Sequence, residues 1–211
     1  MTDLVIVGAG GCAREVYGMA LDAYPAEEYR VKGFLSDRAG DLDSFPDLCG
    51  KAPIIGTIRS YEPKEGERFL LAIGTPEDRK AVACAMKGRG AKFLSLIHPK
   101  AHVSRTAKLG EGVILYPFSL VSCYVELGDF CMLNAYAGCG HDARIGAYSV
   151  LAPYATALGF AEAGERCFLS THSMLAPKKK LGSGGVIAAN SSALRDAPEE
   201  AFVCGVPGKN M

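Results

Sequence analysis

The second half of the chain repeats with a period of six residues. From Val103, stepping six residues at a time, fifteen successive positions through Ile187 are apolar, with no break in register. Amphipathic helices repeat about every 3.6 residues and half-buried strands about every two, so neither produces this pattern. A period of six is typical of a hexapeptide β-helix, a solenoid of short strands in which each strand points one large apolar residue inward. The repeat therefore restricts this part of the chain to one kind of fold.

Small side chains occupy the position four residues after each apolar one. These positions run from Ala107 to Ser191 and hold Ala, Ser, Cys, Val or Gly, apart from Lys179. The residue directly after the apolar one is mostly Gly, Ser, Ala or Asn, and we expect it to ease the corners of the coil. Three hexads make one triangular coil of 18 residues, so fifteen hexads make five coils. We predict a left-handed parallel β-helix over residues 98–211, with no α-helix between Val103 and Ile187.

The first 97 residues alternate between apolar runs and helical segments, as a Rossmann-like βαβ domain does. Strands are predicted at 4–7, 31–37, 69–74 and 92–97, and helices at 14–23 and 81–87. Between the first strand and the first helix, Gly8-x-Gly10-x-x-Ala13 matches the loose dinucleotide fingerprint. Glycines there let the backbone approach a diphosphate at the N-terminus of the helix. Asp37, at the end of the second strand, is placed to accept hydrogen bonds from a ribose or a base.

The same glycine pattern also occurs in nicotinamide oxidoreductases and in plain strand-to-helix turns. A span of 97 residues is little more than half of a dinucleotide-binding fold, and a β-helix follows it where a dehydrogenase would have a catalytic domain. We therefore expect this loop to hold one nucleoside diphosphate.

Charge and hydropathy exclude several kinds of partner. The chain has 23 basic and 23 acidic side chains, so it has no general electrostatic attraction to nucleic acid or anionic lipid. No segment approaches the roughly 18–20 apolar residues of a membrane span, and the acidic N-terminus does not resemble a signal peptide. We expect a cytoplasmic protein with no membrane or nucleic-acid partner. The eight cysteines include no CxxC pair and are expected to be reduced apolar fillers.

Several segments resemble one known family. The loop at residues 8–11, the strand end at 33–37 and residues 72–74 are similar to its N-terminal domain, the run 133–142 to its catalytic segment, and the run 203–209 to its C-terminal cap. The family is the sialic acid O-acetyltransferase and nucleotide-amino-sugar N-acetyltransferase group, which includes the bacillosamine-pathway and perosamine acetyltransferases. The chain departs from it at Val150, where some members have a second histidine, and at Ser36, where an acid is usual.

The resemblance implies an acetyl-CoA-dependent enzyme that forms a homotrimer, with acetyl-CoA in the cleft between neighbouring β-helices. It implies that a nucleotide-linked sugar is held partly by the N-terminal domain, at Gly8, Gly10, Gly11, Ser36, Asp37 and Gly74. It also places Asn134, in the catalytic segment, against the base or the substrate.

His141 is the candidate catalytic base. Attack on a thioester requires an amine or hydroxyl that gives up its proton, and histidine, which titrates near neutrality, can accept it. Asp142 directly follows His141 and is expected to orient the imidazole. Because one coil has 18 residues, Gly159 should lie in the same column, about 4.8 Å away. Its open N–H is then placed to stabilise the oxyanion of a tetrahedral intermediate, and the family's oxyanion donor falls on this same position.

The sequence gives weaker indications of a catalytic or binding role for the other histidines and for a run of three lysines. His98 and His102 are expected to be structural or solvated at the start of the prism, and His172 to lie at a surface corner. The cations Lys178, Lys179 and Lys180 are candidates to meet the phosphates of coenzyme A, although a charge run is also typical of a solvated face.

We therefore predict N-acetylation of the amino group of a nucleotide-linked deoxyamino sugar in bacterial glycan precursor synthesis. The alternatives are O-acetylation of sialic acid or another sugar hydroxyl, and a non-catalytic trimeric scaffold that binds a nucleotide sugar. A metal-dependent hydrolase would require clustered histidines, and the four in this chain are dispersed, so no metal is expected.

Overall fold

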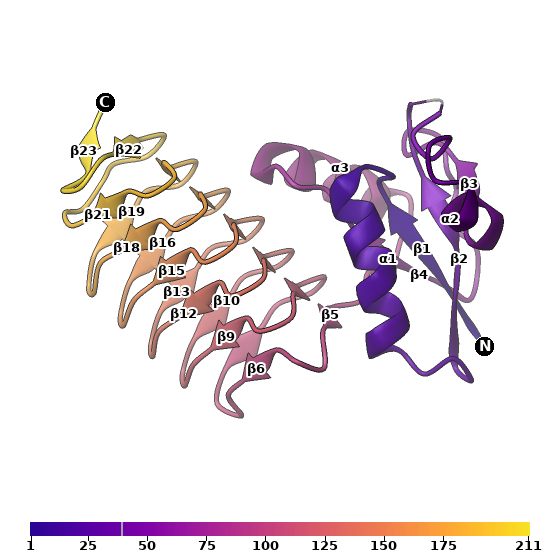
Figure 1. Cartoon of the computed structure of the whole chain (residues 1–211), viewed down its shortest axis with the longest axis horizontal. Helices are drawn as coiled ribbons and strands as arrows, with labels where there is room; N and C mark the ends of the chain where they lie inside the picture. The colour runs from indigo at the N-terminus through magenta and orange to yellow at the C-terminus, as the bar shows by residue number, and fades with distance from the viewer. Residues whose placement is uncertain (39) are drawn as a thin grey trace. The chain divides into compact units, whose positions relative to one another are not determined.

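The computed structural model describes residues 1–38 and 40–211, which form two compact units. One unit comprises Met1–Gly74 and Asp78–Leu96, and the other comprises Thr75–Glu77 and Ile97–Met211. In Figure 1 the first unit carries the long helices, and the second is a stack of strand-bearing coils that runs to the C-terminus. Within the described residues, no helix has the length and apolar character needed to cross a membrane.

The first unit is built on a four-stranded parallel sheet with the strand order β3-β2-β1-β4. The strands are β1 (Thr2–Val7), β2 (Tyr29–Leu35), β3 (Ile54–Gly56) and β4 (Glu67–Leu71), and the helices are α1 (Gly11–Ala23), α2 (Pro46–Lys51) and α3 (Pro76–Gly88). Residues 4–7 of β1 are all buried, as an apolar run in a parallel sheet should be. The expected Rossmann-like architecture is confirmed.

Three details of this unit differ from the prediction. Both helices expected in it begin earlier, because α1 starts at Gly11 and α3 at Pro76. The short elements α2 and β3 lie in a segment for which no element was predicted. The strand predicted at 92–97 is wrong, because only Phe93 bridges the sheet, through Phe69, while β5 (Leu96–Ile97) belongs to a sheet of the β-helix.

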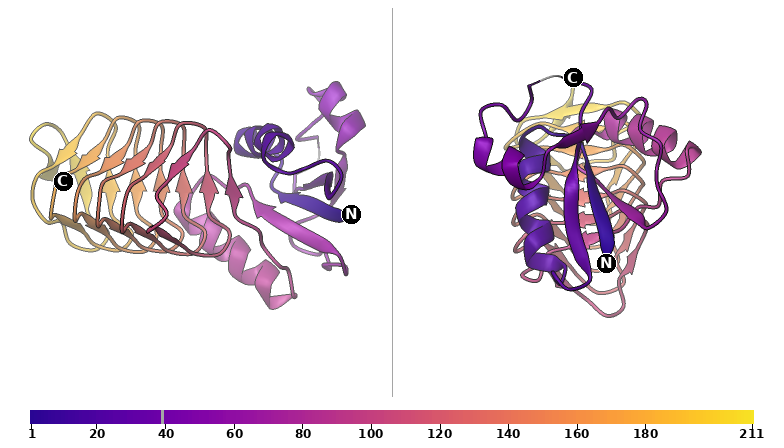
Figure 2. Two further views of the ribbon diagram at one scale, coloured as in Figure 1. Left: turned by 90° about the horizontal axis from the view of Figure 1, so that it is seen from below. Right: turned by 90° about the vertical axis from the view of Figure 1, so that its right-hand side faces the viewer.

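The second unit is a left-handed parallel β-helix whose three faces are sheets of short strands, almost all of them parallel and two residues long, as Figure 2 shows along the stack of coils. The five-stranded sheet contains β7 (Lys108–Leu109), β10 (Glu126–Leu127), β13 (Arg144–Ile145), β16 (Glu162–Ala163) and β19 (Lys180–Leu181). We call it the charged face. The six-stranded sheet contains β6 (His102–Val103), β9 (Leu120–Val121), β12 (Gly138–Cys139), β15 (Thr156–Ala157), β18 (Met174–Leu175) and β21 (Ser192–Ala193). We call it the uncharged face.

The third face contains β5 and seven further strands, of which only the last is antiparallel to its neighbour. They are β8 (Ile114–Leu115), β11 (Met132–Leu133), β14 (Val150–Leu151), β17 (Phe168–Leu169), β20 (Val186–Ile187), β22 (Phe202–Cys204) and β23 (Lys209–Asn210).

The six-residue repeat fills the prism as predicted. Every apolar step position from Leu115 to Ile187 is buried, and Val103 and Leu109, at the open end, are partly buried against the same core. Adjacent coils pair in a register of 18 residues, so that Leu127 pairs with Ile145. Between Val103 and Ile187, all of which is described, there is no α-helix. The predicted fold class is therefore confirmed.

The glycines after the apolar positions have a different role from the one expected. A Cβ on Gly128 would lie 2.5 Å from the amide nitrogen of Ala147, and one on Gly146 would lie 2.4 Å from the carbonyl carbon of Gly164. A side chain is thus excluded at these glycines by the close approach of the next coil, and not by the backbone conformation of the corner. The corner residue comes two positions later, and there non-glycine residues, mostly aromatic, adopt positive φ values such as 60° at Phe160. Hydrogen bonds to the preceding coil offset the cost of this left-handed conformation.

The interpretation of the cysteines as apolar fillers holds for only part of the set. Cys131, Cys139 and Cys167 lie in the core of the prism, where burial raises the pKa of the Cys167 thiol to about 11. Cys12 is partly buried. The remaining four are exposed, namely Cys49, Cys84, Cys123 and Cys204.

Candidate active site

His141 lies in the turn that joins β12, on the uncharged face, to β13, on the charged face. We call the stack of equivalent turns, at residues 123–124, 141–142, 159–160 and 177–178, the His141 corner. Buried Cys139 and Ala143 fix the two ends of the turn inside the prism. The His141 side chain itself is 56% exposed, so it is accessible to a substrate.

Asp142 holds one nitrogen of the imidazole. The His141 Nδ1 atom lies 2.9 Å from the Asp142 Oδ2 atom. A carboxylate accepts hydrogen bonds, so in the neutral ring this contact places the proton on Nδ1 and the free lone pair on Nε2. The predicted role of Asp142 in orienting the base is consistent with this geometry. The arrangement leaves Nε2 as the basic atom.

The imidazole lies against Gly159 of the next coil. A Cβ built on Gly159 would be 2.7 Å from the His141 Nε2 atom and 2.8 Å from its Cε1 atom. The Gly159 carbonyl accepts a hydrogen bond from the Lys178 amide, whereas the Gly159 amide makes no hydrogen bond within the described part of the chain. The column expected from the 18-residue coil thus places Gly159, whose amide makes no hydrogen bond within the described residues, beside the imidazole.

Asn134 is not brought to this site within one chain. It lies in the turn between β11 and β12, at the opposite edge of the uncharged face, and its Oδ1 atom accepts the Ala135 amide at 2.7 Å. Of the two partners predicted for Asn134, the base and the substrate, His141 of the same chain is therefore excluded, because one full strand separates the two residues.

The lysine run divides between two surfaces. Lys178 lies exposed at the His141 corner, one coil beyond Gly159. Lys179 is partly buried, and Lys180 points out of the charged face, where its Nζ atom is 2.9 Å from the Glu162 Oε2 atom. Only Lys178 thus shares the corner with His141.

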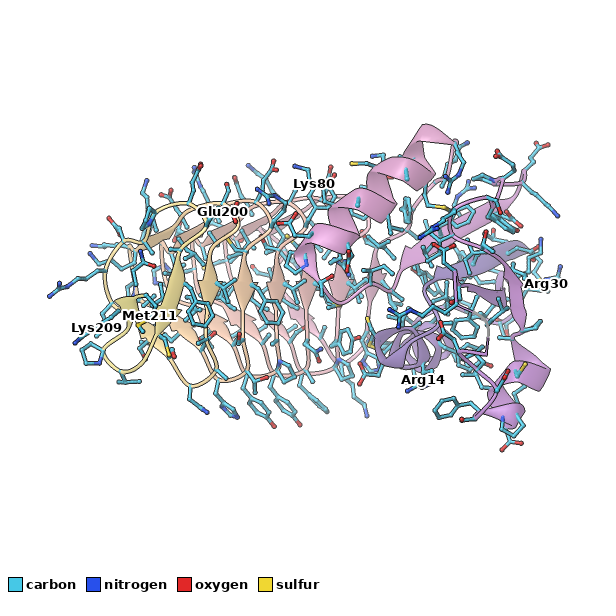
Figure 3. All side chains as sticks on the ribbon, turned by 90° about the horizontal axis from the view of Figure 1, so that it is seen from above. Arg14, Arg30, Lys80, Glu200, Lys209 and Met211 are labelled. Carbon is cyan, nitrogen blue, oxygen red and sulfur yellow. The ribbon has the colours of Figure 1, made fainter. Side chains whose placement is uncertain are left out.

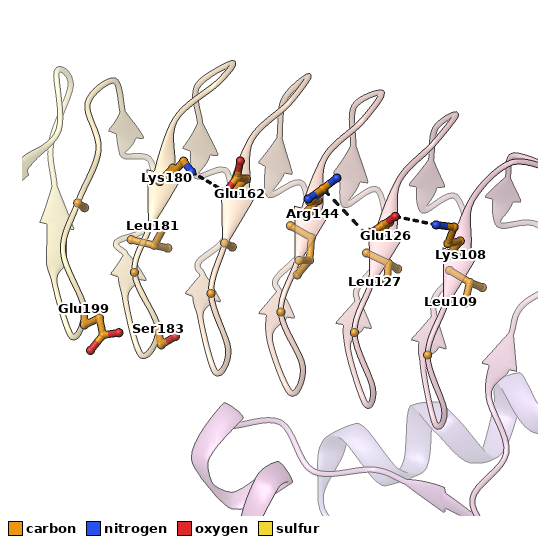
Figure 4. Close-up of a pocket in the computed structure, with 18 residues that line it drawn as sticks. Lys108, Leu109, Glu126, Leu127, Arg144, Glu162, Lys180, Leu181, Ser183 and Glu199 are labelled. Carbon is orange, nitrogen blue, oxygen red and sulfur yellow. Dashed lines mark hydrogen bonds and ion pairs between the residues drawn. The ribbon is translucent and has the colours of Figure 1, made fainter.

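The charged face carries a ladder of alternating charges, shown in Figure 4, formed by Lys108, Glu126, Arg144, Glu162 and Lys180. Lys108 hydrogen bonds to Glu126 at 2.9 Å and holds the pKa of this carboxyl below its ordinary value. The ladder lines a shallow groove of about 740 Å³. A second hollow, of about 350 Å³, joins the middle of the ladder to the His141 corner at Tyr124, Asp142 and Phe160.

The glycines of the N-terminal loop, and Gly74 in the same unit, differ in whether there is room for a side chain. Gly8 has a φ of 112°, and a Cβ there would lie 2.8 Å from the Ala72 carbonyl oxygen, so this glycine is required by the fold. Apart from their chain neighbours, no described residue has an atom within 4 Å of a Cβ added to Gly10 or Gly74, so both positions face open space. The loop ends at the N-terminus of α1, whose first turn has no acidic residue and whose N-cap makes no side-chain hydrogen bond. A diphosphate would meet the backbone amides of this helix N-terminus there.

Arg14 adds a cation to this loop that the sequence reasoning missed. Its guanidinium lies 4.0 Å from the centroid of the Phe45 ring, and its Nη2 atom is 3.9 Å from where a Gly11 Cβ would be. Figure 3 shows Arg14 on α1. Its position three residues after Gly11, in the first turn of the helix, was the available signal.

Ser36 and Asp37, at the end of β2, already have hydrogen-bond partners in the protein. The Ser36 hydroxyl donates to the Asp41 Oδ2 atom at 2.5 Å and accepts the Arg38 amide. Asp37 accepts the Arg59 amide at 3.1 Å and pairs with its guanidinium. Both residues therefore order the loops at this edge of the sheet in addition to any role in binding.

The remaining histidines lie where they were expected. His98 is buried and its Nδ1 atom accepts the Lys100 amide at 3.0 Å, while His102 is exposed. His172 is exposed at a corner and stacks on Tyr154 at 4.6 Å. Within residues 1–38 and 40–211, no group of three or more His, Cys, Asp or Glu is arranged to hold a metal ion.

Comparison with known proteins gives matches to both units. Residues 3–86 match the PglD N-terminal domain family. No curated protein matches the chain. The acetyltransferase domain of PglB from Neisseria gonorrhoeae, solved with acetyl coenzyme A, is 27% identical, with a TM-score of 0.86 over 99% of this chain and 98% of that one.

Two further structures extend the comparison. A histidine-to-alanine mutant of GDP-perosamine N-acetyl transferase from Caulobacter crescentus, in complex with CoA and GDP-perosamine, is 26% identical, with a TM-score of 0.81 over 100% of this chain and 97% of that one. WeeI from Acinetobacter baumannii is 20% identical over the whole of both chains, with a TM-score of 0.82, and shows the shared fold. The resemblance to the sugar acetyltransferases expected from the sequence is confirmed.

Proposed function

We propose that this chain, an acyltransferase of the sugar N-acetyltransferase family, transfers the acetyl group of acetyl-CoA to the amino group of a nucleotide-linked deoxyamino sugar. The observation that carries the proposal is the position of His141, with Nδ1 on Asp142 and Nε2 against Gly159, whose amide makes no hydrogen bond within the described residues. Two full-length structural neighbours, solved with acetyl coenzyme A and with CoA and GDP-perosamine, support both substrates. The product would serve bacterial glycan precursor synthesis.

The geometry supports a direct transfer. The amine nitrogen bonds to the thioester carbonyl carbon while His141 Nε2 accepts a proton from that nitrogen. The carbonyl oxygen takes up negative charge, and the Gly159 N–H donates a hydrogen bond to it. Collapse of the intermediate breaks the carbon–sulfur bond, and the leaving thiolate takes the proton from the imidazolium. One amine and one thioester thus become one amide and one thiol.

Acetyl-CoA is proposed to approach along the His141 corner. Its thioester would lie at Gly159. Lys178, one coil beyond, is the cation that would bind a phosphate of coenzyme A. Lys180 is paired with Glu162, and Lys179 is partly buried, so we assign both a smaller part in this contact.

The proposed nucleotide site is tested at Gly10. A Gly10→Leu side chain would enter open space, so the fold should be unchanged, but the backbone could no longer approach a diphosphate. We expect the KM for the nucleotide sugar to rise about tenfold or more, with the KM for acetyl-CoA unchanged. Steady-state kinetics with each substrate varied in turn measures this. A lost affinity for acetyl-CoA, or micromolar binding of NADH by the unmodified protein, would contradict the assignment.

A homotrimer is proposed to form through the uncharged face. The outward residues of its strands include no Asp, Glu, Lys or Arg, and they are His102, Leu120, Gly138, Thr156, Met174 and Ser192. Leu120 is 46% exposed in the single chain. An uncharged surface with exposed apolar residues such as Leu120 is typical of a subunit interface, whereas the charged face is typical of a solvated one. Packing there would also bring Asn134 of one subunit, at the edge of this face, towards a neighbour.

The interface is tested by a charge introduced on each face. Leu120→Glu would bury a carboxylate in the interface, so we expect the trimer to dissociate at micromolar concentration. Lys108→Glu, at the matching strand position of the charged face, should leave the trimer intact. Sedimentation velocity measures both. A monomeric unmodified protein, or a Leu120→Glu protein that remains trimeric, would contradict the proposed interface.

Acetyl transfer is tested by the release of CoA thiol with a panel of acceptors. The panel contains UDP-, GDP- and dTDP-linked 4-amino sugars, free sialic acid, and the matching 4-hydroxy sugar nucleotides. We expect turnover with at least one amino sugar and none with its hydroxy counterpart. Turnover with sialic acid alone would favour O-acetylation, and binding of acetyl-CoA without turnover on any acceptor would favour the scaffold.

A further inference from the structure

The imidazole of His141 has a second ring against it. The centroid of the Phe160 ring lies 5.1 Å from that of His141, and the two planes meet at 87°, which is the edge-to-face arrangement that aromatic pairs prefer. Phe160 belongs to the same column as Asp142, one coil further on, and it lies next to Gly159 in the chain. The proposed reaction assigns no role to this ring.

The contact is built into the backbone. The Phe160 amide donates a hydrogen bond to the His141 carbonyl at 2.9 Å, which ties the two residues together across the coils. The positive φ of Phe160 turns its side chain outward at the corner, where the residue is 47% exposed. The point at which the Phe160 side chain leaves the backbone is therefore fixed relative to the backbone of His141, the proposed base.

His141 needs such a constraint. Its side chain is more than half exposed, and the terminal torsion of a histidine is broad, so one hydrogen bond to an adjacent carboxylate leaves the ring other orientations. If the ring turned over, Nε2 would no longer lie against Gly159. Three contacts together define the observed orientation, namely Asp142 at Nδ1, the Gly159 backbone at Nε2 and Cε1, and Phe160 at right angles to the ring.

We propose that Phe160 is a positioning residue, which keeps Nε2 of His141 beside the Gly159 amide and keeps the proton on Nδ1. The inference rests on the proposed function for its kinetic consequence, but the ring geometry itself exists without substrate. Phe160 also lines the 350 Å³ hollow with Asp142, so a competing role is to stack on the sugar ring of the acceptor. The two roles predict different kinetics.

A positioning role lowers kcat, and a stacking role raises the KM of the acceptor. For Phe160→Leu we expect kcat to fall about 5- to 10-fold, with the KM of both substrates within about twofold of the unmodified enzyme. Phe160→Tyr keeps the ring and should restore kcat. Tyr148→Leu is the matched control, because Tyr148 adopts the same backbone conformation, at φ 63°, in the turn between β13 and β14, away from the His141 corner. It should leave kcat within about twofold.

A second measurement needs no turnover. Nitrogen-15 NMR of the imidazole in the resting protein should show one tautomer, with the proton on Nδ1, in the unmodified and Phe160→Tyr proteins. In Phe160→Leu we expect the signals of Nδ1 and Nε2 to move towards a tautomer mixture. An unchanged NMR spectrum, or an unchanged kcat with a raised acceptor KM, would overturn the positioning role. Failure of the unmodified enzyme to acetylate any amino sugar would instead overturn the proposed function, and the NMR result would still decide the role of Phe160.

Discussion

Replacing His141 by alanine is expected to lower kcat about 10²–10⁴-fold, the range that a positioned general base contributes. The imidazole accepts the amine proton only in the transition state, so the KM for acetyl-CoA should change little. His141→Asn should show a similar loss, because an amide keeps much of the shape of the ring but cannot take up the proton. Steady-state rates of thiol release measure both variants.

The control for this prediction is another exposed histidine of the β-helix. His172 lies at a different corner and stacks on Tyr154, away from the proposed thioester position. His172→Ala should keep kcat within about threefold of the unmodified enzyme. A His141→Ala enzyme with full kcat would remove general-base catalysis from this residue and leave catalysis to the positioning of the substrates.

A single methyl group at Gly159 is expected to be nearly as damaging. In Gly159→Ala the added Cβ would lie 2.7 Å from the His141 Nε2 atom, closer than real Cβ contacts allow. The imidazole must then leave the position beside the Gly159 amide, which separates the base from the oxyanion donor. We expect kcat to fall about 100-fold or more, in line with the loss of one oxyanion-hole contact.

The matched control is a glycine that has room for a methyl group. Gly18 lies in α1, and a Cβ added there meets no atom of another described part of the chain within 4 Å, so Gly18→Ala should leave kcat unchanged. Circular dichroism of Gly159→Ala should retain the spectrum of the unmodified protein, since the exposed imidazole and not the core must move. Normal turnover by Gly159→Ala would show that Nε2 does not act from its observed position.

The β-helix was predictable because the packing inside the prism determines the sequence repeat directly. Each coil points one apolar residue per strand into the prism, so the period of six and the column spacing of 18 follow from the sequence alone. This arithmetic also placed Gly159 beside His141. Side-chain torsions produce no repeat in the sequence. The orientation of the imidazole over Gly159, and its contact with the Phe160 ring, could therefore be seen only in the structure.

The first unit was less predictable because its elements are shorter and less regular. The strand β3 has three residues and α2 has six, too few to establish a period. The apolar residues Leu96 and Ile97 were assigned to the wrong sheet, since two residues fit either unit. The separation of Asn134 from His141 of the same chain was not evident for a related reason. The two residues are seven positions apart in the sequence, but that distance crosses a whole face of the prism.

The pH dependence of kcat tests the central claim most directly. It should be measured with saturating acetyl-CoA and amino sugar for the unmodified enzyme and for His141→Ala. A protonated imidazole cannot accept the amine proton, so we predict that kcat of the unmodified enzyme falls as the pH is lowered. In His141→Ala this fall in kcat at low pH, the acid limb of the profile, should become weaker, and only the part caused by protonation of the substrate amine should remain. An acid limb of the same midpoint and depth in both enzymes would contradict the assignment of His141 as the base.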